Sequence, residues 1–70
     1  MELKLDSKLY SKKAVAEAVE AFAELASISV GAEAERFIVS FSQIDPDYDT
    51  ILVDEFANYA LGLTIEGRDA

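Results

Sequence analysis

The chain has 70 residues, of which 51% are hydrophobic, and it carries a net charge of −8 at pH 7. This length predicts one domain over residues 1–70 with a modest core, and the lack of cysteine and histidine excludes disulfides and the usual zinc sites, so we expect no metal and no cofactor. The acidic charge disfavours nucleic acid and anionic membranes as partners, and with no apolar leader or membrane-length run visible the cytoplasm is the expected location.

The first predicted elements are a short strand and an amphipathic helix. Leu3 and Leu5 alternate with charged residues, which indicates a strand with one buried face. Ser11 is placed to cap the helix, because its hydroxyl can accept from the free N–H groups of the first turn. The helix is expected to run for about four turns. Its apolar stripe contains Val15, Ala18, Val19, Phe22, Leu25 and Ala26.

Two further strands are expected to form a hairpin. Ile28 and Val30 alternate with Ser27 and Ser29, which predicts the second strand, and residues 31–35 are predicted to form the turn. The third strand, over residues 37–42, alternates aromatic and β-branched residues with serines and isoleucine. This composition is typical of strands and makes it the clearest strand pattern in the chain.

A second helix is predicted after an acidic break at residues 45–49, where a proline disfavours helix in the residue before it. Asp49 or Thr50 can cap this helix. Gly62 either lies within the helix or ends it, and residues 67–70 are expected to fray. The predicted apolar stripe contains Leu52, Val53, Phe56, Tyr59, Ala60 and Leu63.

The element order β-α-β-β-α predicts an α+β fold. A right-handed crossover makes the first two strands parallel to each other, and the hairpin makes the third strand antiparallel to both. The simplest arrangement is a three-stranded sheet of order 2-3-1, with the third strand in the middle and two helices packed on one face.

Two segments resemble small proteins of the HxsD type. These are residues 9–15, Leu-Tyr-Ser-Lys-Lys-Ala-Val, which follow the first strand, and residues 53–59, Val-Asp-Glu-Phe-Ala-Asn-Tyr. Proteins of this type belong to the bacterial His-Xaa-Ser gene system, in which they accompany radical-SAM enzymes proposed to modify a ribosomally made peptide. The resemblance spans most of the chain and implies an accessory protein in peptide maturation, with a radical-SAM enzyme as partner and no catalytic residues to carry over.

No catalytic residue is expected, because serine catalysis needs a base and the chain has no histidine. Lys12 and Lys13 are candidates for an anion site, because they lie in the first turn of the first helix, where cations oppose the helix dipole. With the free N–H groups there, they could hold a phosphate or a carboxylate. The alternative is that they only balance the acidic body of the protein.

The acidic break also has the spacing that opens a calcium loop, with Asp45, Asp47 and Asp49 at alternate positions. Such a loop needs glycine at its sixth position and glutamate at its twelfth, and here these positions hold Thr50 and Phe56. A solvated turn that leads into the second helix is therefore the expected structure.

The second strand is predicted to lie at an edge of the sheet. Unpaired N–H and C=O groups there could accept an extended peptide as an added strand. The residues that would supply this edge are Ser27, Ile28, Ser29 and Val30.

A second contact surface is predicted on the second helix, where Ile51, Leu61 and Ile65 fall outside the apolar stripe, and Tyr48 is a candidate contact in the acidic loop. These residues would dock a partner enzyme or a second copy of the chain. The sequence therefore predicts a small acidic, non-enzymatic module that binds a protein or peptide. The alternative is a purely structural domain that forms a homodimer.

Overall fold

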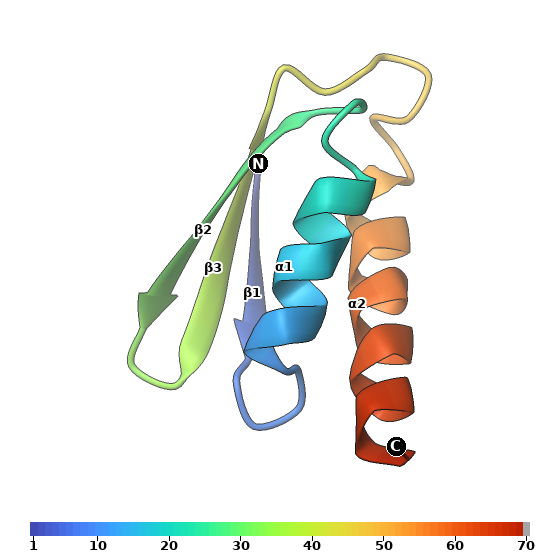
Figure 1. Ribbon diagram of the computed structural model, residues 1–70. Coiled ribbons are helices and arrows are strands. Elements are labelled where there is room, and N and C mark those ends of the chain that lie inside the picture. The colour runs from blue at the N-terminus through green and yellow to red at the C-terminus, as the bar shows by residue number, and fades with distance from the viewer. Residues whose placement is uncertain (70) are drawn as a thin grey trace.

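The computed structural model describes the backbone of residues 1–69 and the side chains of residues 1–67. The elements are β1 (Glu2–Asp6), α1 (Lys12–Ala21), β2 (Ser27–Glu33), β3 (Arg36–Ser42) and α2 (Leu52–Asp69). They form an α+β fold, as predicted, with both helices on one face of a three-stranded antiparallel sheet (Figure 1). The strand order is β1-β3-β2, so β3 is central and β1 and β2 form the edges; counted from the β2 edge, the order is 2-3-1.

The sheet register places most apolar side chains of the three strands on the face beneath the helices, because cross-strand partners in an antiparallel sheet point to the same side. Ile38 is the exception, because its partners are Lys4 and Gly31 and it lies on the opposite face. The opposite face carries the charged residues of β1 and the serines of β2 and β3. The apolar partners are Leu3 with Val39, Leu5 with Phe37, Ile28 with Phe41, and Val30 with Val39.

Phe56 of α2 is fully buried and joins the sheet to both helices. Its ring centroid lies 5.3 Å from that of Phe41 in β3 and 5.6 Å from that of Phe22 at the end of α1, both in edge-on geometry. Edge-to-face pairs at these separations add to the stabilisation that apolar burial already provides. The other buried apolar side chains of this cluster are Leu5, Val15, Ala18, Ala26, Val39, Leu52 and Ala60.

The two helices are also joined by a polar link at Thr64, whose side chain is 2% exposed. The Thr64 hydroxyl donates to the carbonyl of Ala60 at 2.8 Å and accepts from the backbone N–H of Ser11 at 3.1 Å. Ser11 in turn caps α1 as predicted, because its Oγ accepts from the N–H of Ala14 at 3.0 Å. Thr64 thus connects the end of α2 to the start of α1.

The predicted end of the first helix is wrong. α1 stops at Ala21, so Leu25 and Ala26 lie in the turns that lead into β2. Both side chains still contribute to the core. The carbonyl of Leu25 accepts from the N–H of Asp45 at 2.8 Å, a tertiary bond that connects this turn to the acidic loop.

The predicted turn over residues 31–35 is also wrong, because β2 continues to Glu33. The reversal takes only Ala34 and Glu35, and Ala34 has a φ of 55°, a region that favours glycine, asparagine or aspartate. Gly31 and Ala32 have weak strand propensity, but pairing with β3 overrides it.

α2 starts at Leu52, after a turn in which the carbonyl of Tyr48 accepts from the N–H groups of residues 51 and 52. It runs through Gly62, which is therefore inside the helix, and reaches Asp69, so residues 67–69 are helical where fraying was expected; Ala70 lies outside the described residues. Tyr59, which belongs to the predicted apolar stripe, is 44% exposed, and its ring centroid lies 5.5 Å from that of Phe22. Within the described part of the chain, neither helix is long and apolar enough to cross a bilayer.

Replacing Thr64 with valine should lower the free energy of unfolding by about 1–2 kcal/mol, because the N–H of Ser11 loses its acceptor while the side-chain volume is kept. Thr64→Ser keeps the hydroxyl and is the matched control. Amide exchange of Ser11 should become faster in the valine variant and stay close to wild type in the serine variant. An unchanged rate in the valine variant would show that this link contributes nothing.

Candidate functional site

Within residues 1–69, the backbone of β2 has one side that pairs with no other strand. The N–H of Phe41 donates to the carbonyl of Met1 at 2.7 Å, and the N-terminal ammonium of Met1 donates to the carbonyl of Phe41 at 3.2 Å, so the backbone of Phe41 faces β1. Successive residues of a strand direct these groups to opposite sides, so Ser40 faces β2 and its partner Ser29 faces β3. The same alternation directs outward the N–H and C=O groups of Ile28, Val30 and Ala32.

The opposite edge of the sheet, on β1, is protected. Its outward backbone groups belong to Glu2, Lys4 and Asp6, and charged side chains on an edge deter the addition of another strand. The carbonyl of Asp6 also accepts from the N–H groups of Leu9 and Tyr10, each at 3.0 Å. The residues of β2 whose backbone groups point outward are all apolar. The β2 edge therefore lacks both the charged side chains and the internal hydrogen bonds that protect the β1 edge.

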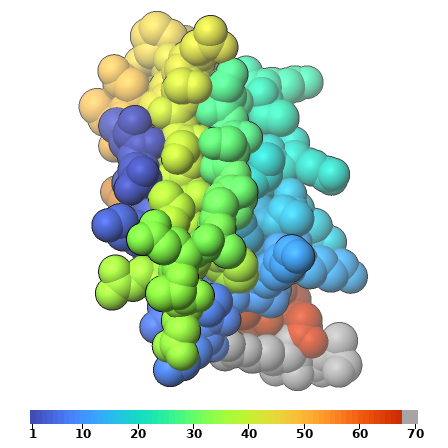
Figure 2. Space-filling view, turned by 90° about the vertical axis from the view of Figure 1, so that its left-hand side faces the viewer, coloured from blue at the N-terminus to red at the C-terminus, as the bar shows by residue number. Residues whose placement is uncertain are grey.

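A groove runs beside the β2 edge, and α1 forms its other wall. Its volume is about 450 Å³. Figure 2 shows α1 alongside β2, projecting beyond the strand's free edge. Val30, which lines this groove, is 42% exposed. The lining residues are Lys12, Val15, Ala16, Val19 and Glu20 of α1, Val30, Gly31 and Ala32 of β2, and Phe37 of β3.

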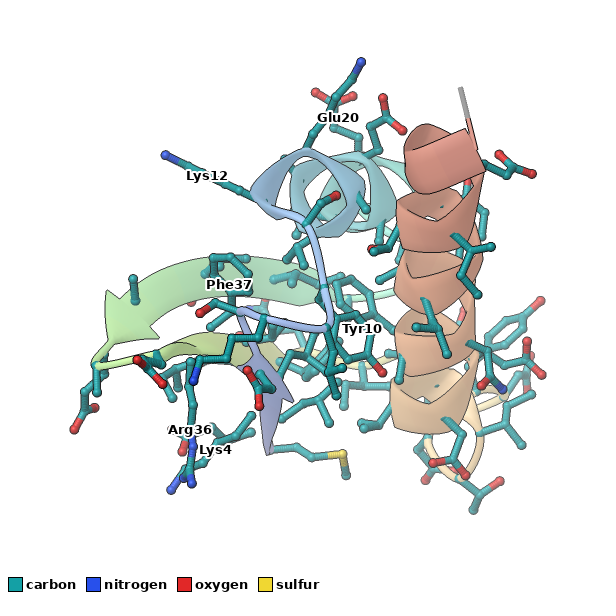
Figure 3. The ribbon with its side chains drawn as sticks, turned by 90° about the horizontal axis from the view of Figure 1, so that it is seen from below. Lys4, Tyr10, Lys12, Glu20, Arg36 and Phe37 are labelled. Carbon is teal, nitrogen blue, oxygen red and sulfur yellow. The ribbon has the colours of Figure 1, made fainter. Side chains whose placement is uncertain are left out.

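Two oppositely charged side chains, Lys12 and Glu20, lie at the two ends of the α1 wall. Lys12 and Glu20 are eight residues apart, which corresponds to about 12 Å along a helix. Figure 3 shows Lys12 extending from α1 on the side where Phe37 lies on the sheet. Among the side chains that the structure describes, neither Lys12 nor Glu20 forms an ion pair. The groove therefore combines an apolar floor with a cation at one end and an anion at the other.

Both ends of β2 are held in place by side-chain hydrogen bonds. At its start, the hydroxyl of Ser27 donates to Oε1 of Gln43 at 2.9 Å. Beyond its end, the carbonyl of Glu35 accepts from the N–H and the hydroxyl of Ser7, at 2.8 and 2.7 Å. An edge fixed in this way is ordered before a ligand arrives, which lowers the entropic cost of binding.

The two lysines of the predicted anion site point to different places. Lys12 lines the groove beside β2, whereas Lys13 lines a shallow pocket between α1 and α2. Glu17 and Glu66 line that second pocket as well. The structure therefore does not bring the two ammonium groups together around one ligand.

The exposed apolar residues near α2 do not form a continuous surface. Ile51, Leu61, Ile65 and Tyr48 are all exposed, and Leu61 and Ile65 lie one turn apart. Ile51, however, lies about 15 Å from Leu61 along the helix axis. Exposed polar residues occupy the intervening turns: Asp54, Glu55 and Asn58.

The acidic loop is ordered by its own carboxylate. Oδ1 of Asp45 accepts from the N–H of Asp47 at 2.9 Å, and the carbonyl of Asp45 accepts from the N–H of Tyr48 at 2.9 Å. This is the turn-forming use of aspartate. The described residues contain no group of three or more acidic side chains arranged to hold a metal ion.

The structure extends the predicted edge and adds the α1 wall, which sequence reasoning missed. Of the four residues predicted to supply the edge, Ile28 and Val30 direct backbone groups outward, and Ala32 joins them. The wall has a signal in the sequence, because Lys12, Ala16 and Glu20 recur every four residues and so lie along one side of α1. What the pattern could not show is that this side lies next to the free edge of β2.

No family model matches the chain, and neither the search of curated proteins nor the search of solved structures finds a match. The resemblance to HxsD-type proteins therefore remains a hypothesis. The groove and the free edge of β2 are the structural features from which a function can be proposed.

Proline substitutions at neighbouring positions of β2 should differ in their cost in stability, according to whether the lost N–H points outward or toward β3. Val30→Pro removes an N–H that points outward, so the protein should stay folded and lose only about 1 kcal/mol of stability. Ser29→Pro removes an N–H that faces β3 and leaves its acceptor on β3 without a partner, which should cost an additional ~1–3 kcal/mol. Urea unfolding of both variants measures the difference. Equal losses would show that the assignment of outward-facing residues is wrong.

Proposed function

We propose that the chain is a non-enzymatic accessory module of the cytoplasm that binds an extended segment of a partner protein or peptide as a fourth strand at the β2 edge. The observation that carries this proposal is the combination of outward backbone groups with an apolar groove along the same edge. The backbone groups belong to Ile28, Val30 and Ala32. Strand addition uses such groups for affinity and adjacent pockets for specificity.

Because α1 projects beyond the free edge of β2, a single extended segment fits this edge better as the added strand than a second copy of the chain does. Neighbouring strands lie about 4.8 Å apart, so an added strand would lie directly beside α1. If the added strand were β2 of a second copy, the α1 helix of that copy would occupy the same space. A homodimer is the second candidate, through Leu61 and Ile65, which are adjacent and exposed on α2.

The expected complex is weak and reversible. Each backbone hydrogen bond contributes a net ~0.5–1.5 kcal/mol, and burying one apolar side chain in the groove contributes about 1.5–3 kcal/mol. Association itself costs at least about 4 kcal/mol. A module that holds a peptide only transiently can pass it on to an enzyme.

The resemblance to HxsD-type proteins supplies a biological setting, in which the bound segment belongs to a ribosomally made peptide presented to a radical-SAM enzyme. An unfolded precursor has free backbone groups along its whole length, which suits strand addition. This setting requires a radical-SAM gene beside the gene for this chain. Without one, the setting loses its support, while strand addition can still be tested on its own.

A phage-displayed library of random octapeptides, panned on the wild-type protein, tests the proposal. Selected peptides should bind Val30→Ala within a few-fold of wild type, because that variant keeps the outward N–H. Their binding to Val30→Pro should weaken about tenfold or more, because the bond to that N–H is lost. Strand addition is wrong if no peptide is enriched, or if both variants bind equally well.

A further inference from the structure

We propose that the segment bound at the β2 edge carries an acidic, an apolar and a basic residue at alternate positions, in that order from its N-terminus. This inference rests on the strand addition proposed above and specifies the chemistry of the added strand. It is carried by the positions of Lys12, Glu20 and the free edge.

Alternate residues of an added strand would face the groove. Residues opposite Ile28, Val30 and Ala32 point to the same face as these three, which is the face beneath the helices. Because side chains alternate along a strand, the groove receives the first, third and fifth residues of a five-residue run. The second and fourth residues face the open side of the sheet, outside the groove, so the groove does not select their identity.

The spacing of the charges on α1 matches that run. The first and fifth residues of a strand are about 13 Å apart, and Lys12 and Glu20 are separated by about 12 Å. Neither has an ion-pair partner among the side chains described. The third residue would lie between them, over Val15, Val30 and Phe37, where an apolar side chain fits. The positive end of the α1 dipole strengthens the preference for an acid beside Lys12.

The direction of the chain fixes the order of the charges. α1 begins at the end of the molecule where β2 ends (Figure 1), so Lys12 lies toward Ala32 and Glu20 toward Ile28. Both strand pairs of this sheet are antiparallel, and antiparallel pairing is slightly more stable per residue. An antiparallel strand starts near Ala32, so its acidic residue precedes its basic one. A parallel strand would reverse this order.

Two blocked heptapeptides of identical composition test the order: Gly-Asp-Thr-Leu-Thr-Lys-Gly and Gly-Lys-Thr-Leu-Thr-Asp-Gly. Each is titrated into ¹⁵N-labelled protein at low salt, and the amide shifts of Ile28, Val30 and Ala32 report binding. The acid-first peptide should bind about three- to tenfold more tightly, as expected for two solvent-accessible ion pairs. The preference should shrink in 0.5 M NaCl, because exposed charges are screened.

Charge exchange on α1 supplies the decisive variant and its control. The double variant Lys12→Glu/Glu20→Lys should prefer the base-first peptide. Lys13→Glu/Glu17→Lys makes the same exchange on the same helix but away from the groove, so it should keep the wild-type preference. A reversal in both variants would overturn the assignment to Lys12 and Glu20.

The outcomes separate this inference from the proposed function. Equal affinity of the wild type for both peptides overturns the charge order and leaves strand addition intact. Preference of the wild type for the base-first peptide overturns the antiparallel direction. If neither peptide shifts the amides of the β2 edge, the proposed function fails, and the inference fails with it.

Discussion

The packing of Phe56 between Phe22 and Phe41 is the interaction on which the rest of the structure depends. It holds α1 and α2 against the sheet around one buried ring, and the small Ala18 and Ala60 are buried nearby in the same cluster. Two helices drawn together in this way do not cover a three-stranded sheet completely. The groove lies where α1 and β2 diverge from this core, and Val30 on the apolar face of β2 is 42% exposed there.

The contrast between the two sheet edges connects this packing to function. An uncharged, apolar edge invites unwanted pairing, and proteins usually protect such edges. Here β1 carries charges at every outward position, whereas β2 carries none. The net charge of −8 makes copies of the chain repel each other, which opposes pairing of two copies through the open edge. The unprotected edge is the feature on which the proposed binding of a partner strand rests.

Much of the fold could be predicted from local patterns, because alternation and capping are local effects. The strands and the Ser11 cap are examples, and the central position of the third strand follows from the order of the elements along the chain. The extension of β2 through Gly31 and Ala32 could not be predicted, since pairing with β3 decides it against local propensity. The link at Thr64 joins residues 53 positions apart. The edge was predicted in part, but its α1 wall depends on where Lys12 lies relative to β2, which only the packed structure defines.

Amide hydrogen exchange along β2, followed by NMR, tests the central claim most directly. In the free protein, the amides of Ile28, Val30 and Ala32 should exchange at least about a hundredfold faster than those of Ser29 and Gly31, whose N–H groups bond to β3. Addition of a selected peptide should slow the first set and leave the second nearly unchanged. Uniform protection along β2 in the free protein, or no slowing when a peptide is bound, would contradict an open edge that accepts a strand.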